Sequence, residues 1–99
     1  MKNIEHIKKR LEELKPILEE TFQVEIIGVF GSYVRGEQTN KSDVDVLVQF
    51  KQEAHIELLK YVELEIFLNE QLDVKVDLVA KGSLKHSLKE RISSEVVYV

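Results

Sequence analysis

Hydrophobic residues near the start of the chain recur at intervals of three and four. They are Ile4, Ile7, Leu11, Leu14 and Leu18. This spacing places them on one side of an amphipathic helix. Pro16 falls inside the pattern and predicts a kink or a restart of that helix, because proline lacks the backbone N–H that a helix interior needs.

The same period returns twice further along the chain. Between residues 54 and 71 it is carried by Ile56, Leu59, Val62, Ile66 and Phe67. Near the end it is carried by Leu84, Leu88 and Ile92. Both segments are predicted to be helices, and we expect their apolar side chains to face the core.

Three other segments have the composition of strands. Residues 24–30 are rich in aliphatic side chains and stop at a glycine, which favours a mostly buried strand. Residues 43–50 alternate at first and then become apolar, and residues 74–79 alternate throughout.

Short connections join these elements without a linker or a repeat. Residues 32–37 are predicted to form a short helix capped by Ser32, followed by a polar loop at 38–41. Gly82 and Ser83 begin a last turn, and residues 96–99 form an apolar tail. The order is helix, strand, short helix, strand, helix, strand, helix, so we expect residues 1–99 to form a single α/β domain.

The composition narrows the class of protein. With 43% hydrophobic and 32% charged residues, the chain fits an ordinary globular protein. It has no cysteine, which excludes disulfides and thiolate metal sites, and no apolar run near the ~20 residues of a membrane span. No secretory signal is visible, so the cytoplasm is the simplest location. The formal charge of −4 argues against a nucleic-acid surface, and a bound cation would offset part of it.

Two carboxylates stand out at the start of the second predicted strand. Asp43 and Asp45 are two residues apart, so they point to one face, about 6.6 Å apart along the backbone. Such carboxylates repel each other unless a cation lies between them, and magnesium favours this type of oxygen ligand. Taken alone, the pair fits a structural role equally well, with Asp43 capping a turn beside Ser42 and Asp45 half exposed.

A third acid shifts this balance toward a metal site. Asp77 lies in the strand predicted at 74–79, on the face opposite Val76 and Leu78. If the two strands are neighbours, Asp77 can reach the same cation or take a proton from an incoming hydroxyl. Asp73 lies four residues earlier and is the competitor for this role, but we expect it at the exposed start of the strand.

The residues before the acids are suited to an anion. Gly31 directly follows a buried strand, so backbone N–H groups can approach a phosphate without an intervening Cβ. Ser32 can donate its hydroxyl to a phosphate oxygen, or act only as a helix cap. Arg35 can contact the phosphates, or hold the loop through Glu37 or Asp43.

Together these residues resemble a known signature. Gly31 and Ser32, then ten residues, then Asp43-Val44-Asp45 resemble the Gly-Ser-x10-Asp-x-Asp motif of the nucleotidyltransferase superfamily that includes polymerase β. The fuller run Gly-Ser-Tyr-Val-Arg-Gly, followed by Ser-Asp-Val-Asp and later Val-Asp-Leu-Val, is similar to the minimal nucleotidyltransferases, the MNT or MntA-type antitoxins.

The resemblance implies a fold and a reaction. The fold is a small mixed β-sheet flanked by helices. Asp43, Asp45 and Asp77 would hold two Mg²⁺ ions, and Gly31 and Ser32 would position the triphosphate of ATP, with Arg35 as a further candidate. An acceptor hydroxyl would attack the α-phosphate and release pyrophosphate.

The resemblance also implies a partner, because a chain of 99 residues leaves no room for an acceptor domain. The family precedent is a HEPN-type RNase toxin that receives AMP on a tyrosine, in a hetero-oligomer with its antitoxin. Two alternatives stay open. One is a non-catalytic antitoxin that neutralises its partner by binding, through the apolar tail or the helix around 61–67. The other is transfer to a small molecule.

Overall fold

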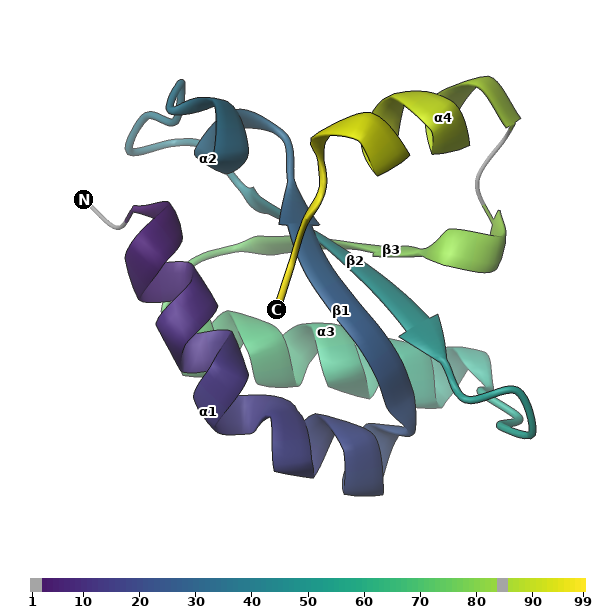
Figure 1. Cartoon of the computed structure of the whole chain (residues 1–99). Coiled ribbons are helices and arrows are strands. Elements are labelled where there is room, and N and C mark those ends of the chain that lie inside the picture. Colours follow the sequence, from purple (N-terminus) through teal and green to yellow (C-terminus); the bar gives the residue numbers. More distant parts are fainter. Residues whose placement is uncertain (1–2, 84–85) are drawn as a thin grey trace.

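A computed structural model of the protein describes residues 3–83 and 86–99. Helices and strands alternate along most of it (Figure 1). The elements are α1 (Ile4–Phe22), β1 (Val24–Phe30), α2 (Ser32–Arg35), β2 (Val44–Phe50), α3 (Leu58–Leu72), β3 (Val76–Ala80), the 3₁₀ turn η1 (Lys81–Ser83), α4 (His86–Glu95) and β4 (Val97–Tyr98). No helix in these two ranges combines the length and apolar character that crossing a bilayer requires.

The strands form one mixed sheet in the order β3-β2-β1-β4. β1 pairs antiparallel with both β2 and β4, whereas β2 and β3 are parallel. A parallel pair needs a crossover connection, and α3 supplies it between β2 and β3. The predicted fold class, a small mixed sheet flanked by helices, is confirmed.

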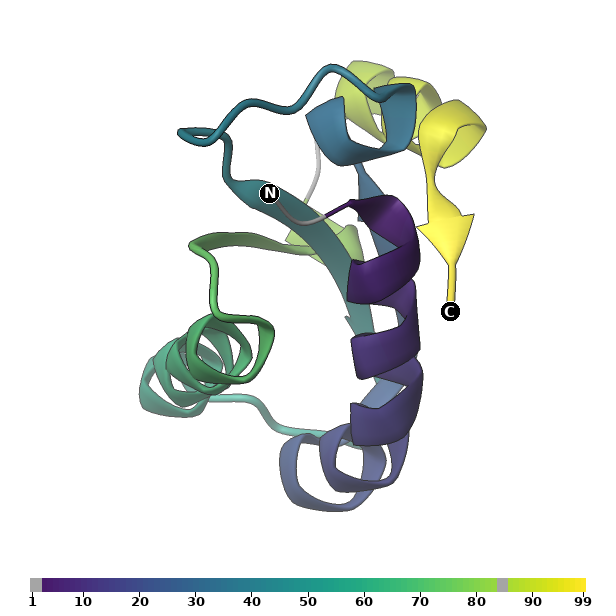
Figure 2. The same cartoon turned by 90° about the vertical axis from the view of Figure 1, so that its left-hand side faces the viewer.

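The core lies between one face of this sheet and the pair α1 and α3. In Figure 1, α3 and most of α1 occupy the lower part of the molecule, whereas α2 and α4 lie at its top. Turned by 90°, Figure 2 shows α3 and α4 on opposite sides of the molecule. Alternate residues of β2, Val44, Val46 and Val48, are fully buried in this core. The residues between them point to the other face, which we call the acidic face because it carries Asp45 and Asp77.

The first helix matches its predicted pattern. Four of the five periodic residues are buried, and α1 begins after Asn3, whose side chain accepts a hydrogen bond from the backbone N–H of His6. Pro16 lies inside one continuous helix, so the helix does not restart there. Figure 1 shows its axis turning about half way along, as a proline within a helix leads one to expect.

The buried side of α3 differs from the prediction. Leu59, Val62 and Ile66 are exposed, and the side of the helix that faces the core is made by other leucines. These are Leu64, Leu68 and Leu72. The helix carries two apolar stripes, and spacing alone does not say which one is buried.

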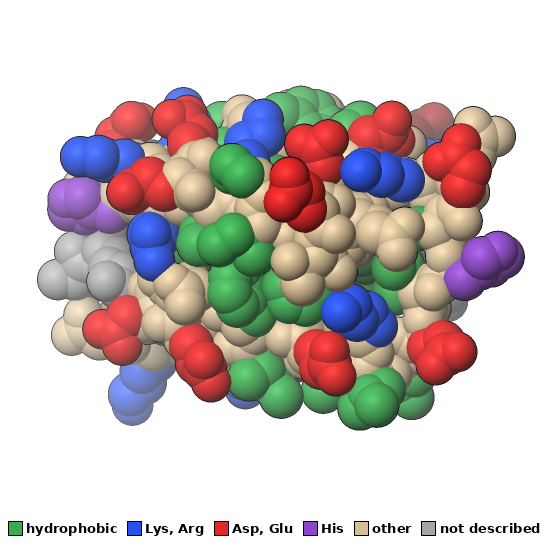
Figure 3. Space-filling model, turned by 90° about the horizontal axis from the view of Figure 1, so that it is seen from below, with side chains coloured by type: hydrophobic (Ala, Val, Ile, Leu, Met, Phe, Trp, Pro, Cys, Tyr) green, Lys and Arg blue, Asp and Glu red, His purple; other side chains and the backbone are tan. Residues whose placement is uncertain are grey.

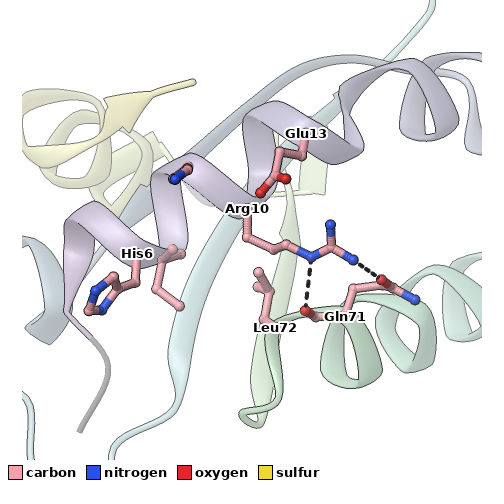
Figure 4. A pocket seen from close by; sticks show the side chains of 7 residues that line it. His6, Arg10, Glu13, Gln71 and Leu72 are labelled. Atoms are coloured by element: carbon pink, nitrogen blue, oxygen red, sulfur yellow. Dashed lines mark hydrogen bonds between the residues drawn. The ribbon is translucent and has the colours of Figure 1, made fainter.

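Two polar contacts fix the rotation of α3 against β3. The Tyr61 hydroxyl donates to the Leu78 carbonyl oxygen at 2.6 Å, and the Val76 N–H donates to Asn69 Oδ1 at 2.6 Å. A third contact joins α3 to α1. The Arg10 guanidinium donates to the Gln71 carbonyl and side-chain oxygens, across the groove shown in Figure 4.

The remaining differences concern the ends of elements. β3 begins at Val76 and not at residue 74, because Asp73 ends α3 in a left-handed conformation (φ 54°). Asp73 is therefore not on the strand that carries Asp77. In the C-terminal segment, β4 pairs with β1 and Val99 packs against the core, whereas Tyr98 is exposed. Leu84 and the side chain of Leu88 lie outside what the structure describes.

Candidate active site

The pairing of β2 with β3 brings two of the three predicted acids together. In the parallel register Asp45 lies directly beside Asp77, and both lie on the acidic face. The two carboxyls are close enough that a protonated Asp45 can donate a hydrogen bond to Asp77, which disfavours the ionisation of Asp45. Asp43 comes just before β2 and is half-buried. Asp43 is close enough to Asp45 for its negative charge to raise the pKa of the Asp45 carboxyl.

Burial and like charges act together on Asp45. Its pKa is raised from 3.8 to about 6, first by burial, then by the negative charges of Asp77 and Asp43, and also by the hydrogen bond that the protonated Asp45 carboxyl donates to Asp77. Arg35 partly opposes this shift. A carboxyl whose ionisation is so disfavoured is stabilised by a cation placed between it and its neighbours.

The donor set fits magnesium. All three side chains offer carboxylate oxygens, the ligands that Mg²⁺ prefers, and magnesium usually takes one or two carboxylates together with substrate phosphates and water. Among residues 3–83 and 86–99, no three His, Cys, Asp or Glu side chains are already gathered as a complete metal cluster. Asp45 and Asp77 therefore form a preassembled pair, to which Asp43 adds charge.

The raised pKa of Asp45 predicts how stability varies with pH. The folded state holds this proton more tightly than the unfolded state, so the contribution of Asp45 to stability is full below pH 3.8 and is lost as the pH rises through about 6. In EDTA, Asp45→Asn should therefore be more stable than the wild type at pH 8, and the difference should shrink toward pH 4. Urea denaturation of both proteins at several pH values measures this. A wild type that is the more stable of the two at pH 8 would contradict the electrostatic picture.

Gly31 approaches an acid more closely than the sequence suggests. Its backbone has φ 81° and ψ −153°, a region open essentially to glycine alone. A Cβ built on it would lie 2.0 Å from Asp45 Oδ2. We predicted this glycine for close approach to a phosphate. The structure gives it a second role, which is to leave room for the Asp45 carboxylate.

Ser32 is not the cap of α2. The cap position belongs to Gly31, and Ser32 is the first residue of the helix. The prediction was one residue late because the helix begins directly after Gly31, whose positive φ of 81° makes the turn out of β1. Ser32 is half-buried beside Gly31, so its hydroxyl is free of the capping role that was the alternative to contacting a phosphate.

Arg35 is tied to two glutamates. Its Nε donates to Glu37 Oε1 at 3.1 Å, and Glu37 is one of the two partners predicted for Arg35 from the sequence. Its Nη1 donates to Glu95 Oε1 at 2.5 Å. The Gly31 N–H donates to the same Glu95 oxygen at 2.7 Å. Glu95 thus joins α4 to the glycine turn and to Arg35. Sequence reasoning missed it, because 64 residues separate it from Gly31 and no local pattern links them.

Removing this carboxylate should loosen the turn. Glu95→Ala would leave the partly buried Gly31 N–H without its acceptor, and we expect a loss of about 1–3 kcal/mol in the free energy of unfolding. Glu95→Gln keeps an acceptor oxygen and should lose less. Chemical denaturation of the two variants separates the effects, and equal stability of Glu95→Ala and the wild type would show that the contact contributes nothing.

A shallow pocket opens beside Gly31. Its walls come from β1, α2 and α4, and its lining residues are Phe30, Gly31, Arg35, Arg91, Ile92 and Glu95. Arginine is well suited to bind phosphate, and the pocket contains two arginines, of which Arg35 is already paired with Glu37 and Glu95.

Comparison with known proteins agrees with this geometry. The nucleotidyltransferase domain family matches residues 11–99. The chain is 48% identical to the protein adenylyltransferase MntA of Thermococcus cleftensis over 99 residues, covering 100% of this chain and 98% of that protein.

Two solved structures are also similar. One is a minimal nucleotidyltransferase, 30% identical, with a TM-score of 0.81 over 97% of this chain and 95% of that one. The other is a toxin–antitoxin structure with AMP-PNP, 28% identical, with a TM-score of 0.68 over 95% of this chain and 69% of that one. With its signature residues placed around one carboxylate pair, this chain belongs to the nucleotidyltransferase domain family, among the minimal nucleotidyltransferases of the MntA type.

Proposed function

We propose that this protein transfers AMP from ATP to a tyrosine hydroxyl of a HEPN-type toxin and acts as the antitoxin of that pair in the cytoplasm. The observation that carries the proposal is the Asp45–Asp77 pair on the acidic face, beside a glycine turn that two arginines flank. The proposal is supported by the relative named as a protein adenylyltransferase and by the similar toxin–antitoxin structure with AMP-PNP.

In this proposal Asp43, Asp45 and Asp77 hold two Mg²⁺ ions. When bound, magnesium neutralises charge on the phosphates and on the attacking and leaving oxygens. The side chains do the positioning. Asp45 lies against Gly31 on one side and next to Asp77 on the neighbouring strand. Asp77 lies on the edge strand β3 and is exposed, so it is open to an acceptor hydroxyl whose proton it can take.

The triphosphate would lie along the glycine turn. Gly31 keeps a Cβ out of the turn, and Ser32 offers a hydroxyl. Arg35 and Arg91 line the adjoining pocket, and a phosphate would compete there with Glu95 for the Gly31 N–H and for Arg35. The acceptor oxygen forms a bond to the α-phosphorus as the bond to the bridging oxygen breaks, and pyrophosphate leaves. No covalent intermediate on this chain is needed, and the hydroxyl proton passes to a carboxylate or to solvent.

Incubation with ATP, magnesium and the protein encoded next to this chain, taken as the candidate toxin, tests the proposal. Intact-mass measurement should show AMP added to the toxin, and peptide mapping should place it on a tyrosine. A stable complex without added mass would favour an antitoxin that acts by binding alone. Modification of a small molecule and not of the toxin would favour the third function.

Nucleotide binding should also stabilise the fold. Magnesium-ATP at a hundred times its dissociation constant is expected to raise the free energy of unfolding by about 2.7 kcal/mol, because it binds only the folded protein. Thermal melts with and without magnesium-ATP measure this. Asp45→Asn is the control and should show little shift. A wild-type melting temperature that does not respond to magnesium-ATP would argue against a nucleotide site.

A further inference from the structure

An apolar stripe on α3 has no partner within the described part of the chain. Four large aliphatic side chains of this helix are exposed: Leu58 (79%), Leu59 (69%), Val62 (40%) and Ile66 (50%). At 100° per residue, the last three lie within a narrow arc of the helix surface, nearly opposite the buried leucines. The whole of α1, by contrast, has Ile17 as its one strongly exposed large aliphatic residue.

Acidic side chains border this stripe on both sides. By the same helical geometry, Glu63 and Glu70 lie along one edge and Glu65 along the other. The single lysine of α3, Lys60, is turned away, with its ammonium 5.1 Å from the centre of the Phe22 ring and 3.8 Å from Glu63. Figure 3, which views the molecule from the side of α1 and α3, shows hydrophobic surface among acidic and basic side chains.

We propose that this α3 stripe is a docking surface for an amphipathic helix of a partner protein that carries lysine or arginine beside its own apolar residues. The apolar side of an amphipathic partner helix can cover an exposed apolar stripe of this kind. Basic side chains on that partner helix would complement the acidic residues that border the stripe. A second copy of this chain fits poorly, because its stripe has the same acidic borders and each copy carries a net charge of −4.

The position of the stripe leaves the candidate active site open. α3 packs on the core face of the sheet, whereas Asp45 and Asp77 lie on the acidic face. A partner held on α3 would therefore not cover the carboxylates. Binding of the partner and transfer of AMP become separable properties of one small chain.

The test uses the toxin partner and so rests on the proposed function for its choice of probe. Isothermal titration of the toxin against Leu59→Ser/Ile66→Ser should give a dissociation constant at least tenfold above that of the wild type. Ile17→Ser, at a residue of similar exposure on α1, should change it less than twofold. Glu63→Lys/Glu70→Lys should also weaken binding, and the matched pair Glu12→Lys/Glu20→Lys on α1 should not.

The outcomes are distinct. If the wild type and the stripe variants bind the toxin with equal affinity, the docking surface is contradicted and the proposal of AMP transfer is unaffected. A wild type that does not bind the toxin also contradicts the docking surface. Weakened binding, with AMP transfer preserved at saturating toxin, supports it. A wild-type complex without AMP transfer contradicts the proposed function, while the stripe is still judged by affinity. Sedimentation of the chain alone covers the remaining case, because a dimer that the stripe variants abolish would make α3 a self-association face.

Discussion

Replacing Asp45 with asparagine is expected to lower the rate of AMP transfer by about 10³-fold or more. The amide keeps the shape of the side chain but loses the negative charge that holds a divalent cation. A metal ion contributes several kcal/mol of charge stabilisation in reactions of this type, and each 1.36 kcal/mol corresponds to a tenfold change in rate. Single-turnover transfer to the toxin, followed by mass spectrometry, measures the loss.

Asp73→Asn is the matched control for this substitution. Asp73 is exposed at the end of α3 in a left-handed conformation, which asparagine also adopts readily. It should transfer AMP at nearly the wild-type rate. Asp77→Asn should resemble Asp45→Asn, because the two carboxyls are direct neighbours. If Asp73→Asn lowered the rate of transfer more than Asp77→Asn does, the third carboxylate of the site would be Asp73 and not Asp77.

Gly31→Ala is expected to reduce transfer by about 100-fold or more and to destabilise the protein. The new methyl group would lie 2.0 Å from Asp45 Oδ2, so the carboxylate must move. A displacement of about 1 Å at a catalytic group can cost 10²-fold in rate. The backbone conformation adds about 1–3 kcal/mol of strain for any residue with a Cβ.

Gly36→Ala separates these two causes. Gly36 also has a positive φ, 72°, but a Cβ built there meets no atom within 4 Å. It should show a modest loss of stability with transfer largely preserved. Paired measurements of urea denaturation and transfer for the two variants give the comparison. Transfer by Gly31→Ala at the rate of Gly36→Ala would mean that contact with Asp45 does not matter.

The sequence predicted the elements and the family because these depend on local patterns. The spacing of apolar residues in α1, the alternation in β2 and the gap between Gly31 and Asp43 all lie within short windows. The sequence could predict that Asp45 and Asp77 lie close together only if their two strands were assumed to be neighbours. The parallel register that makes them direct neighbours depends on how α3 packs, which no short window contains.

Two errors have the same origin. In α3, Leu59, Val62 and Ile66 have the same period as the leucines that are buried, so periodicity identified a helix without identifying its core side. Glu95 reads as an ordinary acid at the end of a helix. Its role depends on α4 returning to the glycine turn, a contact between residues 64 positions apart.

The sheet order has a further consequence for β3. This strand lies at the edge of the sheet, and it carries one of two carboxylates that repel each other across the β2–β3 pair. A divalent cation bound by Asp45 and Asp77 together would link the edge strand β3 to the neighbouring strand β2. Metal binding should then slow amide hydrogen exchange in β3 more than in β1. The ion would in that case stabilise the edge strand as well as take part in catalysis.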